Sequence, residues 1–358
     1  MAKIKKILPR HIWQPLGSSA TSISRTAVYN GIVIVTIILM LQTQAHSQLQ
    51  WKQVDTIPLP KGVTLYYSNT PLNDIGHTRA YYLKLPLKNK KLHYTVDTTY
   101  KRRLTPSQYY TKNNQPLAVV NATYFRFDNS QNQNVIIKDG KVIAQNLSSV
   151  SRKNADSIIV NMRLARSAIG ITKKRKADIA WVQTDSNSTI ATAAQYPTFG
   201  EKYTFYFPDN DKIKKGNIAL PKNTIRKNSF TPWNMQTAIG GGPALIHEGE
   251  INITTQFEQL FTNRTGQDDK HPRTAIGYTK KGYLIILVVE GRNKGIADGA
   301  SLAQLASIMK GIGCYEALNL DGGGSSCMLV NGKETIKPSD ATGQRAIPAV
   351  FLVQLRNK

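Results

Sequence analysis

Cysteines and acidic side chains are both scarce in this sequence. The 358 residues include two cysteines, and 22 Asp and Glu residues stand against 47 Lys and Arg residues, which gives a formal net charge of +25. A charge of this sign raises the local concentration of anionic partners such as polysaccharides, phosphorylated glycans, lipid headgroups or nucleic acid. Nucleic acid is disfavoured, because the sequence has no helix-turn-helix, zinc-finger or RNA-binding signature.

The two cysteines, Cys314 and Cys327, leave two possibilities open. In an oxidising compartment they can pair across the glycine-rich segment between them and restrain it. Alternatively, both are small buried residues with free thiols. No cysteine and histidine have the spacing of a zinc site, which argues against a structural zinc module.

Apolar runs long enough to span a membrane comfortably are missing. The most apolar stretch, residues 28–41, follows a basic segment without acids and precedes the small-x-small sequence Ala45-His46-Ser47. This order predicts that residues 1–47 are a secretory signal and that the protein is periplasmic or extracellular. An uncleaved signal-anchor, which would tether the protein to a membrane, is the alternative. Without residues 1–47 the chain loses five basic residues and no acid, and its charge is +20.

Beyond the signal, we expect a strand-rich segment over residues 48–112 that packs on a main domain over residues 113–358. Alternating and apolar runs predict strands at 80–85, 92–98, 167–171, 179–182 and 203–207. Asp139-Gly140, between two apolar runs, predicts a hairpin turn. Together these patterns predict an α+β (mixed α/β) fold: a β-rich domain with a mixed sheet, a few helices and one strand-helix-strand crossover near the C-terminus.

The segment CYEALNLDGGGSSCMLV, residues 314–330, narrows the function most. Its short apolar run ends abruptly at Asp321, and Gly322, Gly323 and Gly324 follow. Three successive glycines mark a turn with unusual backbone angles or a close approach to a ligand, and their N–H groups can form an anion-binding nest. The alternative is a tight structural turn in which the aspartate bonds to its own backbone.

The sequence before this segment predicts a helix over residues 301–313. It opens with a capping box, continues with apolar residues at helical spacing and ends in glycines. An apolar strand that ends at Glu290 precedes it. Strand, helix and strand form a crossover, which predicts two neighbouring parallel strands with Glu290 and Asp321 at the same edge of one sheet.

Two further segments supply candidates for the site. A second glycine triplet, residues 240–242, precedes a hairpin whose tip carries His247 and Glu248, which we expect to be exposed. As a backbone platform, Gly241 and Gly242 can face Asp321. Arg273 and Thr274 lead directly into an apolar strand at 275–278, which can place a guanidinium at the edge of the sheet; the alternative is an ordinary surface arginine.

Several of these segments, taken in order, resemble the core of the phosphodiester glycosidase family. The resemblance rests on HPRTAIGYTKKGYLIILVVEGRN and GASLAQLASIMKGIGCYEALNLDGGGSSCMLVNGK, and extends to VNATYF, AIGGGPALIHEGE and GQRAIPAVFLV. It covers the chain from residue 115 onward. One motif departs from the family pattern: two aromatics usually follow Asn-Gly-Gly, whereas this chain has NATYF at residues 121–125. Loss of two glycines predicts a narrower or reshaped pocket.

The resemblance implies a secreted phosphodiester glycosidase that hydrolyses the C1–O bond of a sugar-1-phosphodiester, similar to a GlcNAc-1-phosphodiester. The products are free sugar and a phosphomonoester. Because a phosphomonoester is a weak base, its departure has little need of a general acid. Cations and N–H donors that hold the phosphate matter more, and a carboxylate must stabilise the oxocarbenium-like centre or activate water.

These requirements assign roles to specific residues. Asp321, Glu290 and Arg273 are the catalytic candidates, with Asp321 first among the carboxylates. Candidates for holding the substrate are arginines, polar side chains and glycine amides: Arg292, Arg345, Asn121, Thr274, Ser325, Ser326, Gly241, Gly242, Gly322, Gly323 and Gly324.

The last predictions concern cofactors, partners and an alternative function. No cofactor is required by the sequence, although Asp321, Glu290 and Asp298 offer the oxygen ligands that Ca²⁺ prefers. If the protein is a phosphodiester glycosidase, its partner is a phosphorylated glycan or exopolysaccharide substrate. The alternative function is a non-catalytic envelope protein that binds anionic exopolysaccharide through its basic surface, and the departure from Asn-Gly-Gly favours it.

Overall fold

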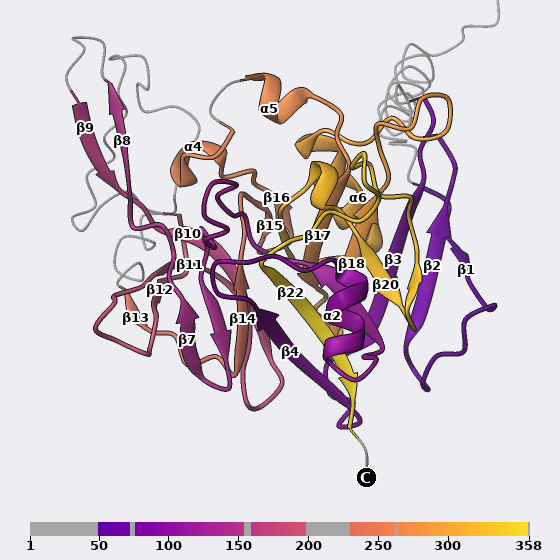
Figure 1. The fold of residues 1–358 in the computed structure, drawn as a ribbon, viewed down its shortest axis with the longest axis horizontal. Helices are drawn as coiled ribbons and strands as arrows, with labels where there is room; N and C mark the ends of the chain where they lie inside the picture. The colour runs from indigo at the N-terminus through magenta and orange to yellow at the C-terminus, as the bar shows by residue number, and fades with distance from the viewer. Residues whose placement is uncertain (1–48, 72–75, 154–158, 198–229, 262–263, 357–358) are drawn as a thin grey trace, which may run out of the picture. The chain divides into compact units, whose positions relative to one another are not determined.

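The computed structural model describes residues 49–71, 76–153, 159–197, 230–261 and 264–356 (Figure 1). Strands outnumber helices, and the β-rich domain predicted from the sequence is confirmed. Every strand pair in these ranges is antiparallel, so the prediction of a mixed sheet is wrong. The predicted strand at 203–207 and the predicted signal at 1–47 lie outside the described residues. Among the described residues, no helix is both long enough and apolar enough to cross a membrane.

The largest sheet has eight strands and carries most of the candidate residues. In spatial order they are β1 (Lys52–Gln53), β2 (Thr64–Ser68), β3 (Ala80–Pro86), β18 (Tyr283–Val289), β17 (Arg273–Tyr278), β19 (Glu316–Asn319), β15 (Ala244–His247) and β16 (Glu250–Ile251). The strands predicted at 80–85 and in the apolar run before Glu290 are confirmed as β3 and β18, and they pair with each other.

A seven-stranded and a five-stranded sheet share their core with the first. The seven strands are β13 (Thr231–Pro232), β12 (Thr192–Ala194), β11 (Ala177–Gln183), β10 (Arg166–Ile171), β14 (Thr237–Gly240), β6 (Ile136–Lys138) and β7 (Lys141–Ala144). The five are β21 (Lys333–Glu334), β20 (Met328–Val330), β5 (Ala118–Asn121), β22 (Ala349–Leu355) and β4 (Leu92–Thr98). A separate hairpin joins β8 (Ser149–Lys153) to β9 (Ile159–Arg163).

The eight-stranded sheet is buried on both faces. Leu284, Ile286 and Val288 of β18 point into a core shared by all three sheets, whereas the intervening residues of β18 pack under a helix. That helix, α6 (Leu302–Ile312), contributes Leu305 and Met309. Because successive side chains of a strand point to opposite faces, burial on both sides explains the unbroken apolar run in this part of the sequence.

Local signals in the sequence locate α6 and one hairpin correctly. The Ser301 side chain accepts from the Gln304 N–H, the Gln304 side chain accepts from the Ser301 N–H, and Gly313 ends the helix with φ +95°. The β6–β7 turn has Asp139 and Gly140 at positive φ, as the two-residue hairpin requires. The other helices are short: α2 (Pro106–Lys112), α4 (Thr255–Glu258) and α5 (Arg264–Asp268).

The predicted crossover has a different topology. Strands β18 and β19 flank α6 in sequence and run in the same direction, but β17 lies between them and pairs with both. The prediction that they are neighbours is therefore wrong. The pairing of β17 with β18 is a local hairpin, but the pairing of β17 with β19 joins segments far apart in the sequence, and no local pattern indicates it.

The hairpin of β15 and β16 also differs from expectation in one side chain. Glu248 is exposed as predicted, but His247 is buried, and its Nδ1 lies 3.0 Å from Glu316 Oε1. Trp181 and Tyr196 pack edge-on against the imidazole. Strand β15 includes His247, which places this side chain in the core and not at the exposed tip of the hairpin.

Replacement of the α6 cap tests this description of the helix. Ser301→Ala removes the hydroxyl that accepts the Gln304 N–H, and we expect a loss of about 1 kcal/mol in the free energy of unfolding. Ser307→Ala on the same helix is the matched control, because Ser307 Oγ bonds back to the Ala303 carbonyl and alanine has the higher helix propensity. Urea unfolding of both variants provides the measurement. Equal destabilisation by the two substitutions would contradict the capping role.

Candidate active site

The site forms around Asp321, at the end of β19. The Asp321 N–H donates to the Ala122 carbonyl (3.1 Å), and the Gly322 N–H donates to Asp321 Oδ1 (2.9 Å). Burial raises the pKa of the Asp321 carboxyl to about 6, although Ser325, the Gly322 amide and the charge of Arg345 act in the opposite direction. A carboxyl with this pKa is ionised at neutral pH and can accept a proton at modest cost.

Asn121 fixes the backbone at this point. Its Nδ2 donates to the Asp321 carbonyl (2.6 Å), while its Oδ1 accepts from Thr274 Oγ1 (2.8 Å) and from the Cys327 N–H (3.1 Å). Both Asn121 and Thr274 are fully buried. Asn121 and Thr274, both predicted to bind substrate, therefore hold β5, β17 and the loop after β19 together next to the carboxylate.

Three arginines surround the glycine triplet that follows Asp321. An added Cβ on Gly322 would lie 3.9 Å from Arg273 Cδ, one on Gly323 would lie 3.2 Å from Arg292 Nη2, and one on Gly324 would meet the guanidinium of Arg345. A short 3₁₀ turn, η1 (Gly323–Ser325), begins inside the triplet, and Gly323 has φ +60°. Glycine is needed at 323 and 324 because the guanidiniums of Arg292 and Arg345 occupy the space that side chains would fill, whereas a Cβ on Gly322 would lie 3.0 Å from the Pro272 carbonyl oxygen.

The three guanidiniums differ in their own partners. Arg273 is buried, donates to the carbonyls of Ala300 (2.9 Å) and Asp269 (3.1 Å), and has its pKa lowered by burial. Arg345 donates from Nε to Asp340 Oδ2 (2.7 Å) and is a quarter exposed.

Arg292 is the exposed member of the three, and it has a left-handed backbone with φ +58°. Its Nη2 lies 3.3 Å from His271 Nδ1. Burial, followed by the charges of Arg273 and Arg292, lowers the pKa of His271. A neutral imidazole at neutral pH can accept the hydrogen bond from Arg292. The role of His271 was not predicted, although the residue directly precedes the Pro-Arg sequence that drew attention to Arg273.

Glu290 has partners of its own. The side chain is fully buried; Oε1 accepts from Asn293 Nδ2 (2.7 Å) and Oε2 from the Lys337 N–H (3.1 Å), with Arg79 Nη1 at 3.6 Å. These contacts tie together the loops at the end of β18. Because β17 lies between β18 and β19, Glu290 and Asp321 follow strands that are not neighbours.

The second glycine triplet carries the chain from β14 in the seven-stranded sheet to β15 in the eight-stranded sheet. A Cβ on Gly241 would collide with the Asn319 carbonyl, and Gly242 has φ +119° and donates its N–H to the same carbonyl (2.8 Å). The predicted platform, Gly241 and Gly242, therefore contacts β19 at Asn319, two residues before Asp321, and supports that strand.

Tyr124 connects this platform to the site and was missed by the sequence reasoning. Its hydroxyl donates to the Gly242 carbonyl (2.9 Å) and also lies 3.3 Å from the Leu320 carbonyl, and it accepts from Asn319 Nδ2 (2.7 Å). Burial and the charge of Asp321 raise the pKa of the phenol. The position of Tyr124, directly after Thr123 and before Phe125, gave no signal that its hydroxyl would bridge two sheets.

The remaining candidates fall into three groups. The Ser325 hydroxyl faces both Asp321 and Arg345, whose Nη1 lies 3.5 Å away, whereas the buried Ser326 hydroxyl has no hydrogen-bond partner among the described residues.

Cys314 and Cys327 are both buried and free, so of the two possibilities, a disulfide or two buried thiols, the structure shows two buried thiols. The described residues contain no cluster of three or more metal-binding side chains, and Asp298 bonds instead to the His77 N–H (3.2 Å).

A comparison with known families identifies the chain. The model of the phosphodiester glycosidase family matches residues 114–354, which is more than half of the sequence. The chain belongs to the phosphodiester glycosidase family. Bovine N-acetylglucosamine-1-phosphodiester alpha-N-acetylglucosaminidase is 38% identical over 103 residues, which cover 27% of this chain and 19% of the relative. The human enzyme of the same name is 34% identical over 103 residues, covering 27% and 20%. The alignments thus span about a fifth of these relatives.

Solved structures share the family fold at low sequence identity. The catalytic domain of the zebrafish N-acetylglucosamine-1-phosphodiester alpha-N-acetylglucosaminidase has a TM-score of 0.51 and 21% identity, covering 86% of this chain and 89% of that one. A hypothetical protein from Synechocystis has a TM-score of 0.55 and 15% identity, covering 87% and 64%. The similarity extends over most of the phosphodiester glycosidase chain described here.

The departure from the family pattern at 122–123 is accommodated by buried side chains. The Ala122 methyl packs in the core shared by the three sheets, and the Thr123 hydroxyl donates to Asn132 Oδ1 (2.6 Å). Both residues are buried. The added side chains therefore point into the protein, and they give no support to the predicted narrowing of a pocket.

The raised pKa of Asp321 predicts an effect on stability. Because the folded-state pKa, about 6, lies above the ordinary value of 3.8, folding is less favourable once pH rises through this interval. Asp321→Asn should therefore increase the free energy of unfolding at neutral pH, by about 3 kcal/mol, and leave it unchanged below about pH 3. Urea unfolding at several pH values measures the difference.

The control for this measurement is Asp185→Asn, which changes an exposed aspartate that accepts the Asn187 N–H in a surface turn. Its stability should follow the wild type at every pH. A wild-type protein that equals Asp321→Asn in stability at neutral pH would show that Asp321 has an ordinary pKa.

Proposed function

We propose that this phosphodiester glycosidase hydrolyses the C1–O bond of a sugar-1-phosphodiester and releases free sugar and a phosphomonoester. The observation that carries the proposal is the combination of one carboxylate, Asp321, with the guanidiniums of Arg292 and Arg345, which lie against the adjacent glycines, and with the buried Arg273 beside Gly322. Ordinary glycoside hydrolysis uses a pair of carboxyl groups on either side of the bond. In this site the second predicted carboxylate, Glu290, is closed off by its own partners.

The excess of cations over carboxylates matches a phosphate leaving group. A departing phosphomonoester needs little protonation, but its growing charge needs hydrogen-bond donors and positive charge. Arg292 is exposed and can present a bidentate fork to phosphate oxygens, with the Gly323 loop beside it. Arg273 is buried behind the loop and adds its charge without leaving its carbonyl partners.

Asp321 then acts on the sugar side of the bond. In its ionised form the carboxylate stabilises positive charge at C1 or accepts a proton from the attacking water. The water oxygen bonds to C1, the C1–O bond breaks, and the electron pair leaves with the phosphate. Asn121, Thr274 and Tyr124 position the strand end that holds this carboxylate. Export, by the predicted signal at 1–47, would place the reaction on extracytoplasmic glycans of the GlcNAc-1-phosphodiester kind.

Removal of the Asp321 charge tests the catalytic assignment. With a GlcNAc-1-phosphodiester as substrate, Asp321→Asn should lower kcat by at least about 10²-fold while the protein stays folded, because it removes the group that accepts the proton or faces C1. Asp185→Asn should retain wild-type turnover. Sugar release is measured together with thermal unfolding. Full activity in a folded Asp321→Asn protein would refute the role.

Arg292 provides a test of the phosphate contact. Arg292→Ala should lower kcat/KM by about 10²-fold, and Arg292→Lys should fall between the two, because lysine keeps the charge but lacks the planar fork. Lys294→Ala, at another exposed position of the same loop, is the control for charge. Comparable losses in Arg292→Ala and Lys294→Ala would point to a general field effect and against a specific contact.

A phosphodiesterase that cleaves the P–O bond is the chemical competitor, and the position of the label separates the two reactions. In heavy-oxygen water, C1–O cleavage places the label in the sugar, whereas P–O cleavage places it in the phosphate. Binding of an anionic exopolysaccharide without turnover is the non-catalytic alternative. It predicts salt-sensitive binding in a protein that turns over no sugar phosphodiester, whatever the linkage.

A further inference from the structure

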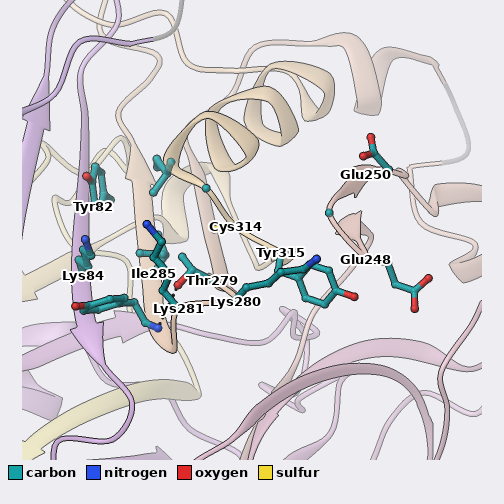
Figure 2. Close-up of a pocket in the computed structure, with 14 residues that line it drawn as sticks. Tyr82, Lys84, Glu248, Glu250, Thr279, Lys280, Lys281, Ile285, Cys314 and Tyr315 are labelled. Carbon is teal, nitrogen blue, oxygen red and sulfur yellow. Dashed lines mark hydrogen bonds between the residues drawn. The ribbon is translucent and has the colours of Figure 1, made fainter.

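A pocket of about 470 Å³ lies at the end of the eight-stranded sheet away from Asp321 (Figure 2). It is bounded by the β17–β18 turn, the C-terminal end of α6, the β15–β16 turn and strand β3. Strand β17 separates it from the site, since Arg273 begins this strand and the turn with Lys280 follows its end. At a rise of about 3.4 Å per residue, the two lie roughly 17 Å apart or more.

Lysines and tyrosines dominate the pocket. Lys280 Nζ lies 4.4 Å from the centre of the Tyr315 ring, and Lys84 Nζ lies 4.4 Å from that of Tyr283. Cation–π attraction at these distances holds each ammonium against a ring instead of leaving it to sample solvent. Lys281 stands beside Lys280 in the same turn, and Tyr82 lies across from it near Lys84.

The pocket carries a surplus of positive charge. Within the described parts of the chain, Lys84, Lys280 and Lys281 make no ion pair with a carboxylate. Of the two acids of the pocket, Glu250 Oε2 pairs with Lys310 Nζ (2.6 Å) outside it, whereas Glu248 keeps its charge, with Oε1 3.5 Å from the Tyr196 hydroxyl. Figure 2 shows both glutamates on the opposite side from Lys84.

We propose that this pocket is a second, non-catalytic binding site for an acidic sugar unit of a polysaccharide. An ammonium lies over one face of Tyr283 and of Tyr315, so a sugar would pack against the edge or the other face of these rings, and the tyrosine hydroxyls can bond to its hydroxyl groups. The ammonium groups beside the rings select a carboxylate or phosphate on that sugar. A protein partner fits less well, because interfaces deplete lysine and call for a larger apolar core. The site does not depend on the chemistry of Asp321.

Binding of defined polymers to the full chain tests the proposal. We expect polygalacturonate to bind, fully methyl-esterified polygalacturonate to bind much more weakly, and polyglutamate, an acidic polymer without sugar rings, to bind much more weakly as well. A phosphomannan in place of polygalacturonate distinguishes a phosphate from a carboxylate as the preferred anion. Affinity electrophoresis or calorimetry at fixed salt gives the dissociation constants, since charge-based binding weakens with ionic strength.

The double variant Lys280→Gln and Lys281→Gln should weaken polygalacturonate binding by about tenfold or more, because it removes two charge-assisted contacts. Tyr315→Ala tests the ring independently and should weaken binding by a similar factor. Lys88→Gln with Lys90→Gln is the matched control, as it removes the same charge from an exposed turn and should change binding by less than about twofold. Asp321→Asn should bind as wild type does, and the lysine variant should hydrolyse a small sugar phosphodiester normally.

Three outcomes would overturn the proposal: no binding of either acidic polysaccharide, equal binding of polyglutamate, or equal loss in the pocket and control lysine variants. Each is independent of the proposed catalysis. Failure of Asp321→Asn to lose turnover would leave the binding result intact, and failure of polymer binding would leave the catalytic result intact.

Discussion

The side-chain amide of Asn121 is the contact on which the site geometry depends. It is fully buried and joins three segments, since it donates to the Asp321 carbonyl and accepts from Thr274 and from the Cys327 N–H. An amide suits this position because it donates and accepts at once, which neither a carboxylate nor an aliphatic side chain can do. Without it, three buried backbone or hydroxyl groups would lose a partner. The five-stranded and eight-stranded sheets thus meet at Asp321 through one side chain.

The glycine loop and its arginines form a pre-arranged cationic site. Arg273 is held by carbonyls, Arg345 by Asp340, and Arg292 by His271, so each guanidinium has a partner that orients it. Only Asp340 among these partners carries a negative charge, so the three arginines together keep a net positive charge. Three like charges around one loop repel one another, and an anion bound among them relieves that repulsion. This arrangement favours phosphate over neutral ligands for an electrostatic reason that holds whichever bond is cleaved.

Local sequence signals predicted local structure well. The cap at Ser301, the stop at Gly313, the Asp139-Gly140 turn and the acid that follows β19 were all correctly read, because each depends on neighbours within a few residues. Predictions were wrong where contacts between distant segments determine the structure. The pairing of β17 with β19, the contact of Glu290 with the Lys337 N–H, and the bridging hydroxyl of Tyr124 all depend on contacts between distant segments that no local pattern encodes. The same limit explains why His247 proved buried.

The raised pKa of Asp321 has a consequence for how the protein meets an acidic environment. Protonation neutralises the carboxylate inside its buried setting, which makes the folded state more stable, whereas the same proton removes the charge on which the proposed chemistry depends. At this one residue, acidification would therefore favour the folded state while it removes the proposed activity, so that stability and activity would change with pH in opposite directions.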